Sequence, residues 1–301
     1  MKIIQSFWTK PIIDKCHYGT ENLDINNIFK KNIDYYNLGA KIFKKMGYSI
    51  EIFTDSLGAE LFKNNNAGQA IKKDLEILNK RDYSPHLWSF SKIYALYTAA
   101  LEYDDKIVHV DNDIFFKDLD YIKNKINSDW EILVQSKEEG IFFNKYYKRS
   151  VQGFCDIFKF NLYQKLDLTT YNYAYNCGFI GFKNKKLLEA FCSKYKSIYE
   201  VVNSDKAGLE KYLYLKNMFA PINFLDGLRI NINCILEQIQ VAEFCNSLNL
   251  NVKEILPKTI WPNPYNGYCL NNITKIKYQH FAGHRKFTDE ETFKKIFSEY
   301  N

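Results

Sequence analysis

The chain has 301 residues, of which 46% are hydrophobic and 17% aromatic, and its formal net charge is +6. This composition favours a folded chain with a large core and argues against intrinsic disorder. No apolar run approaches the roughly 18 residues that a membrane-spanning helix needs. Residues 1–8 are too short and too polar for a secretory leader, so we expect a cytoplasmic protein.

The cysteines and the charge exclude further classes of protein. Seven cysteines occur without a C-x-x-C pair, which favours reduced thiols over a disulfide framework or a zinc site. The positive charge is spread along lysine-rich stretches, which is compatible with peripheral contact with a membrane. No RNA- or DNA-binding motif accompanies it, so we expect no nucleic-acid partner. No repeat or flexible linker divides the chain, and residues 1–301 are predicted to form one domain.

The first part of the chain predicts a strand, a helix and a second strand. Residues 2–8 form an apolar run, and apolar residues then recur at helical spacing between Asp24 and Met46, before Gly47. Residues 48–55 alternate in the manner of a strand and end at Asp55. This order opens a βαβ unit and predicts an α/β fold. Asp55 is predicted either to bind a ribose or a base, or to cap the helix that follows.

The next segment leads to the most informative stretch. Residues 75–78 are predicted to form a short strand, and Ser84 with Pro85 predicts the start of a helix. Lys92 lies off the apolar face of this helix, where it could reach a phosphate or be solvated. The helix precedes the apolar run 106–110 and then Asp111 and Asp113. A buried strand that ends in two carboxylates predicts a divalent cation site, since unpaired carboxylates are strongly disfavoured there.

Further candidate residues follow the acidic strand. Residues 131–134 predict a strand, and the aromatic segment 136–170 predicts an acceptor-binding or lid insertion. Asn176 and Gly178 lie in a strand where a small residue permits close approach of a ligand. Residues 230–244 predict a helix that carries Glu237 and Gln238, whose directions differ by about 100°, so only one is expected to face a site fully. A last strand leads to His280, Gly283 and Lys286.

Asp111-x-Asp113 followed far downstream by His280-x-x-Gly283-x-x-Lys286 resembles the GT-A glycosyltransferases. It is most similar to the retaining enzymes of glycosyltransferase family 8, and Asn176-x-Gly178 looks like that family's N-x-G. Glu237-Gln238 stands where the family has Asp-Gln, and Lys92 stands where it often has arginine. These differences leave a neighbouring D-x-D family open. The resemblance implies a Rossmann-like mixed sheet flanked by helices, with an aromatic insertion.

The resemblance also implies roles for these residues. Asp111, Asp113 and His280 would hold Mn²⁺ or Mg²⁺. Asp55, Lys92, Asn176, Gly178, Gly283 and Lys286 would bind the donor, a nucleoside-diphosphate sugar and in particular a UDP-sugar. Glu237 and Gln238 would act at the sugar, with Gln238 beside the anomeric carbon and Glu237 on sugar hydroxyls or as a base. The acceptor would be a saccharide, a lipid-linked glycan or a protein.

Two other functions fit the same motifs. A nucleotidyltransferase also pairs carboxylates at a strand end, and it predicts release of pyrophosphate from nucleoside triphosphates. A third carboxylate is usual there, whereas this chain has a histidine. A binder of nucleotide sugars or carbohydrates without activity would retain the same core pattern and hydrolyse no donor.

Overall fold

The computed structural model describes residues 1–16, 24–63, 65, 68–139, 143, 147–158, 172–219, 232–256, 278–280, 291, 294–295 and 297–298. The strands of this part are β1 (Lys2–Phe7), β2 (Ile50–Thr54), β3 (Ala70–Lys72), β4 (Ile107–Val110), β5 (Ile114–Phe116), β6 (Ile132–Glu139), β7 (Tyr173–Phe182), β8 (Val252–Glu254) and β9 (Tyr278–His280). The longer helices are α2 (Ile25–Lys45), α5 (Phe90–Glu102), α7 (Lys148–Phe158), α9 (Lys185–Ser204) and α10 (Lys206–Phe219). The shorter ones are α1 (Lys10–Ile13), α3 (Ser56–Lys63), α4 (Glu76–Lys80), α6 (Leu119–Asn127), α11 (Ile232–Cys234) and α12 (Gln240–Ser247), with a 3-10 helix at Pro85–Leu87 and a π-helix at Ile235–Ile239.

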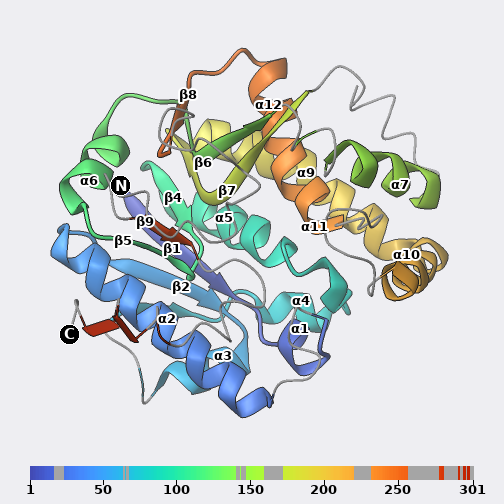
Figure 1. Ribbon diagram of the computed structural model, residues 1–301, viewed down its shortest axis with the longest axis horizontal. Coiled ribbons are helices and arrows are strands. Elements are labelled where there is room, and N and C mark those ends of the chain that lie inside the picture. The colour runs from blue at the N-terminus through green and yellow to red at the C-terminus, as the bar shows by residue number, and fades with distance from the viewer. Residues whose placement is uncertain are drawn as a thin grey trace.

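Seven strands form one mixed sheet in the order β3-β2-β1-β4-β7-β6-β8 (Figure 1). Strands β3, β2, β1 and β4 run parallel, and β7 lies antiparallel between β4 and β6. The expected α/β class, with a mixed sheet flanked by helices, is confirmed. Because β2 lies on one side of β1 and β4 on the other, strand order reverses at β1. In open α/β sheets, ligands bind beyond the carboxyl ends of the strands at such a point.

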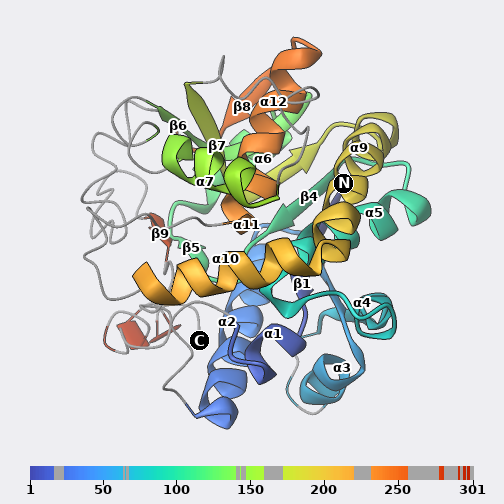
Figure 2. The same cartoon turned by 90° about the vertical axis from the view of Figure 1, so that its right-hand side faces the viewer.

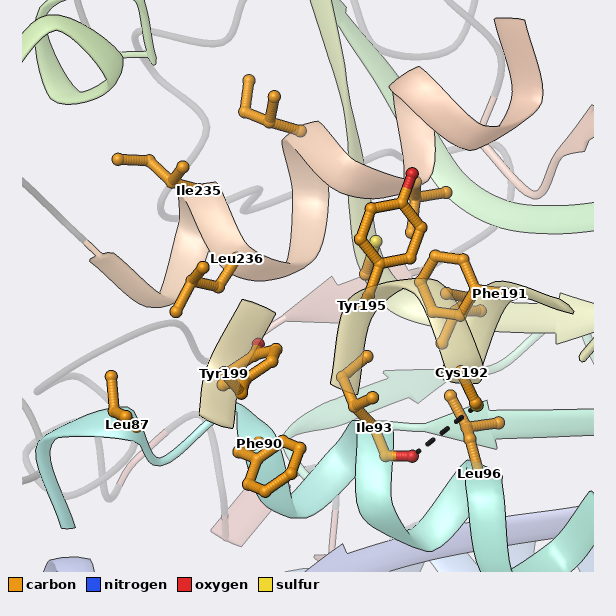
Figure 3. Close-up of a cluster of buried hydrophobic side chains, with 14 of the residues drawn as sticks. Leu87, Phe90, Ile93, Leu96, Phe191, Cys192, Tyr195, Tyr199, Ile235 and Leu236 are labelled. Atoms are coloured by element: carbon orange, nitrogen blue, oxygen red, sulfur yellow. Dashed lines mark hydrogen bonds between the residues drawn. The ribbon is translucent and has the colours of Figure 1, made fainter. Parts of the chain in front are cut away.

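Side chains of successive strand residues pack into two cores, one on each face of the sheet. Ile3 of β1 belongs to the core formed with α2 and α6, and Ile4 belongs to the core formed with α5 and α9. Figure 3 shows the second core, where the ring of Phe90 stacks on that of Tyr199 at 4.6 Å between centroids. Strands buried on both faces read as continuous apolar runs. This explains why residues 107–110 carry almost no polar side chains.

Helix α2 follows closely from its sequence. Its N-cap Asp24 accepts a hydrogen bond from the Asn27 amide at 3.0 Å, which satisfies one of the free N–H groups of the first turn. After its C-cap Met46, Gly47 has a φ of +88°, which glycine adopts without steric cost. The predicted helix between Asp24 and Met46 is therefore confirmed.

Two sequence predictions differ from the structure. The strand predicted at residues 75–78 is wrong, because helix α4 begins at Glu76 and the strand of this region is β3. Leu75 and Leu78 are both buried at a spacing of three, which also suits a helix. The strand predicted at 131–134 is longer in the structure, since β6 extends to Glu139 and so enters the segment 136–170, where α7 also spans Lys148–Phe158. Its role as a lid or an acceptor site stays a prediction.

A second sheet has two strands, β5 and β9, which lie side by side although they are far apart in the sequence (Figures 1 and 2). The strands are antiparallel, and Ile114 is the partner of His280. Among the described residues, no helix combines the length and the apolar character needed to cross a membrane.

Candidate functional site

Lys92 lies at the centre of a buried cluster of charges. It sits in the first turn of α5, and its Nζ is 2.8 Å from Oδ1 of Asp111 and 2.5 Å from Oε1 of Glu237. The same ammonium donates a hydrogen bond to the carbonyl oxygen of Cys177 at 2.9 Å. The side chain is only 6% exposed. The alternative of a solvated lysine is therefore wrong, and α5 brings Lys92 to the carboxyl end of β4 and to the middle of β7.

The charges of this cluster depend on one another. Burial alone would lower the pKa of Lys92, but the neighbouring carboxylates of Asp111 and Glu237 outweigh it and raise that pKa. Burial, together with the charge of Asp111, raises the pKa of Glu237 to about 7, although Lys92 opposes this shift. Lys92 therefore stays charged. Glu237 can exchange a proton near neutral pH, as groups in active sites often do.

His109 spans the point where strand order reverses. Its Nε2 lies 2.9 Å from Oγ of Ser6, at the carboxyl end of β1. Its Nδ1 lies 3.8 Å from Oδ1 of Asp111 and has no hydrogen-bond partner among the described residues. Burial, and then the charge of Lys92, hold the pKa of His109 well below its usual range. The imidazole is therefore neutral. Sequence reasoning missed His109, although it is a single polar residue inside the apolar run 107–110.

Asp111 and Asp113 lie in the turn between β4 and β5. Asp111 is 32% exposed at its side chain, and Asp113 is half-buried. Burial, followed by the charges of these two carboxylates, raises the pKa of Tyr36 well above its usual value. Both acids are thus close enough to one hydroxyl group to affect its titration. Asp111 directly follows the last residue of β4, and Asp113 directly precedes β5.

The late segment of the chain reaches the same turn. His280 pairs with Ile114, the residue directly after Asp113. The backbone at His280 is thus a neighbour of the acidic turn, as the predicted metal site requires. The side chain of His280, and all of Gly283 and Lys286, lie outside the described residues, so their roles stay predictions.

A bulge in β7 exposes backbone carbonyl groups to this cluster. Val134 of β6 pairs with Ile180, whereas Ser136 pairs with Asn176, so the ladder shifts between them. The carbonyl of Cys177 accepts from Lys92, and that of Gly178 accepts from the amide of Asp111 at 2.8 Å. Bulges commonly lie beside active sites because they redirect the chain. Here the bulge ties β7 to both Lys92 and Asp111.

Gly178 and Asn176 have structural roles within this bulge. A Cβ atom at Gly178 would lie 2.1 Å from Oε1 of Gln135 and 2.5 Å from Cδ1 of Ile114. Only glycine fits there without displacing buried side chains. Asn176 accepts from the amide of Gly178 at 3.1 Å and donates to Oε1 of Glu138 at 3.0 Å.

Glu237 and Gln238 both make contacts at the site. They lie on the π-helix Ile235–Ile239, a rare conformation that is frequent at functional sites. Glu237 binds Lys92, and Gln238 contacts the hydroxyl of Tyr147, which also contacts Glu138. Which of the two faces a bound sugar stays a prediction, and Glu237 is the more buried of the pair. Sequence reasoning missed Glu138 and Tyr147, although a carboxylate near the end of a buried strand was a signal for the former.

Asp55 is a helix cap. One oxygen accepts from the Gly58 amide at 3.0 Å, at the start of α3, and the other accepts from both the amide and the hydroxyl of Thr9. Asn79 also donates to it, and Asp55 is 1% exposed. Of the two roles predicted for Asp55, the structure shows the cap. The groups that donate to it belong to Thr9, Gly58 and Asn79.

The carboxylates of Asp111 and Asp113 suit a hard divalent cation, because both are oxygen donors and both retain partial exposure. Among the side chains that the structure describes, no group of three His, Cys, Asp or Glu residues could hold a metal ion. A third protein ligand would therefore come from outside them, and the paired position of His280 is compatible with this.

Comparison with known proteins gives the following similarities. The galactosyltransferase LgtC, solved with donor and acceptor sugar analogues, is 12% identical, with 99% of this chain and 96% of LgtC covered and a TM-score of 0.45. A protein from Desulfovibrio desulfuricans G20, provisionally assigned as a nucleotide-diphospho-sugar transferase, is 10% identical, with 100% and 99% covered and a TM-score of 0.42. No curated protein matches the sequence. Residues 1–299 match a family described as being of unknown function, DUF6734, and the chain belongs to that family.

Proposed function

We propose that this protein is a metal-dependent glycosyltransferase of the GT-A type. It would transfer a sugar from a nucleoside-diphosphate sugar, with a UDP-sugar as the first candidate, to a saccharide, a lipid-linked glycan or a protein. The observation that carries the proposal is the pairing of Ile114 with His280 beside Asp113. It brings together the two halves of the motif on which the resemblance rests, at the sheet edge where α/β proteins bind nucleotides.

The residues of this site would have different roles. Asp111, Asp113 and His280 would hold the cation, which would neutralise negative charge on the leaving diphosphate. Lys92 keeps the side chains of Asp111 and Glu237 in place through two ion pairs. Lys286 and the backbone at Gly283 would contact the phosphates.

The environment of Gln238 favours it as the group beside the anomeric carbon. Gln238 is half-buried, whereas Glu237 is 4% exposed at its side chain and paired with Lys92. Glu138, which is linked to Gln238 through the hydroxyl of Tyr147, is bound by Tyr147 and Asn176. An inverting enzyme needs a carboxylate that can accept a proton from the acceptor. The engaged state of both acids therefore favours retention of anomeric configuration.

The test is hydrolysis of UDP-glucose, UDP-galactose and UDP-N-acetylglucosamine with MnCl₂, by wild type and by variants Asp113→Ala and His280→Ala. We expect each substitution to reduce the rate by about 10²- to 10³-fold, the usual effect of losing one charge-stabilising contact. Asp118→Ala is the matched control, because Asp118 caps α6 by accepting from the amide of Tyr121 at 2.9 Å. Equal rates in wild type and both site variants would refute the metal assignment. Turnover of nucleoside triphosphates alone would replace the proposal with a nucleotidyltransferase.

A further inference from the structure

Four polar side chains form a continuous chain of hydrogen bonds beside Glu237. Asn176 of β7 donates to one oxygen of Glu138, and the hydroxyl of Tyr147 contacts the other. The same hydroxyl contacts the carboxamide of Gln238 on the π-helix. Glu138 is 7% exposed and Tyr147 is 2% exposed. These hydrogen bonds thus link the β7 bulge to Gln238 through Glu138 and Tyr147, two buried side chains to which the proposed reaction gives no other role.

The number of protons constrains this arrangement. A tyrosine hydroxyl has one proton, but here it meets a carboxylate oxygen and a carboxamide at once. Two arrangements satisfy both contacts. In one, Tyr147 donates to Glu138 and accepts from the NH₂ end of Gln238, whose ends exchange by a half-turn of the carboxamide. In the other, Glu138 carries a proton and Tyr147 donates to the oxygen of Gln238.

Each arrangement allows Gln238 only one orientation for a given protonation of Glu138. Asn176 cannot turn freely, because its oxygen accepts from the amide of Gly178 while its nitrogen donates to Glu138. The ring of Tyr147 stacks on that of Phe143 at 5.8 Å between centroids, which restricts its movement. The fixed positions of Asn176, Glu138 and Tyr147 therefore determine the orientation of the Gln238 carboxamide.

We propose that Tyr147 is a positioning residue for Gln238: its hydroxyl, held by Glu138, keeps the carboxamide in the orientation that presents one end to the sugar. This inference rests on the proposed function. It adds to that function a residue from the segment 136–170, which was expected to act only as a lid or an acceptor site.

The experiment compares Tyr147→Phe with Tyr195→Phe. Both tyrosines are buried, and the hydroxyl of Tyr195 contacts Glu243 in the same way as that of Tyr147 contacts Glu138. Tyr195→Phe therefore removes a buried Tyr–Glu hydrogen bond that does not involve Gln238, although Lys194 also binds Glu243. The readouts are kcat for hydrolysis of the UDP-sugar that wild type turns over best, the Kd of UDP with MnCl₂, and the urea midpoint.

We expect Tyr147→Phe to lower kcat by about 10- to 100-fold, as small displacements of reacting groups do. The Kd of UDP should stay within about twofold, because the change affects the sugar end and not the diphosphate. Tyr195→Phe should also lower the urea midpoint, because it too removes a buried hydrogen bond to a carboxylate, and it should leave kcat unchanged. Glu138→Gln is a second variant, which alters the same hydroxyl from its other side and should also lower kcat.

Other outcomes would overturn the inference. A wild-type kcat in Tyr147→Phe and Glu138→Gln, alongside an active wild type, would refute the positioning role and leave the proposed function standing. Parallel losses of kcat, UDP binding and urea midpoint in Tyr147→Phe and Tyr195→Phe would show a general structural effect instead. Absence of turnover in the wild type with UDP-sugars and with sugars carried on the other nucleoside diphosphates would refute the proposed function, and the inference with it.

Discussion

Replacement of Lys92 by methionine tests the electrostatics of the buried cluster without any assumption about substrate. Methionine has a similar length and no charge, so Lys92→Met removes two ion pairs and the hydrogen bond to the carbonyl of Cys177. Asp111 is 32% exposed and can recover solvation, whereas Glu237 is 4% exposed and cannot. The loss should therefore arise mainly from Glu237.

The pH dependence follows from the pKa of Glu237. Burial raises this pKa to about 7, above that of an unfolded glutamate, so the folded state holds a proton that the unfolded state releases. Stability from this group is present at acid pH and is lost as pH rises toward the folded pKa. Lys92 limits this loss because it lowers the pKa of Glu237. In Lys92→Met that pKa should be higher, and the loss should continue to higher pH.

The magnitude has two parts. The lost hydrogen bond to Cys177 and the half-exposed pair with Asp111 should together cost about 1–2 kcal/mol at any pH. Above about pH 7, the cost from Glu237 should grow by about 1.4 kcal/mol per pH unit, until the glutamate ionises in the variant as well. The ceiling is about 3–5 kcal/mol, the usual effect of removing one partner from a buried pair.

The assay is urea denaturation followed by the fluorescence of the four tryptophans, at several values between about pH 6 and pH 9. The difference between wild type and Lys92→Met should increase with pH over this range. The double variant Lys92→Met/Glu237→Gln is the control, and its difference from Glu237→Gln should not depend on pH. If the difference in unfolding free energy between wild type and Lys92→Met did not change with pH, the pKa of Glu237 would not depend on Lys92, and the reasoning would be refuted.

Three further predictions concern stability. Gly178→Ala should lower the free energy of unfolding by about 1–3 kcal/mol, because its Cβ would clash with Gln135. In the control Gly39→Ala, in α2, the new Cβ would contact only Gln5 at 3.5 Å, so this variant should be more stable than wild type by about 0.5–1 kcal/mol. Equal urea midpoints in the two variants would contradict this prediction. Asp55→Ala should cost about 2–3 kcal/mol and leave UDP affinity unchanged if Asp55 only caps α3; weaker UDP binding in titration would restore its predicted nucleotide role. His109→Asn should reduce the loss of stability below about pH 6.5, because the lowered pKa of His109 makes the folded protein resist a proton that the unfolded chain binds; unchanged acid denaturation would argue against it.

Structural features that depend only on neighbouring residues were predicted well from the sequence. The limits of α2 follow from Asp24 and Gly47, because capping and left-handed backbone involve only neighbouring residues. The buried strand β4 and its terminal acids follow from the apolar run before Asp111. The strand predicted at 75–78 failed because Leu75 and Ile77 have the spacing of a strand whereas Leu75 and Leu78 have that of a helix, and so short a segment does not decide between them.

The sequence by itself therefore determined the α/β class, the limits of α2 and the acidic turn after β4, since each depends on short-range periodicity or capping. It did not determine where α5 begins or where β6 ends, because α5 starts at Phe90 and β6 extends to Glu139. Only the tertiary structure decided that Lys92 is buried between two carboxylates, that Asp55 caps a helix and that Tyr147 reaches Gln238. These contacts join residues far apart in the chain. Which residues form them depends on how the helices and strands pack, and a local sequence pattern does not indicate which distant side chain a buried charge will contact.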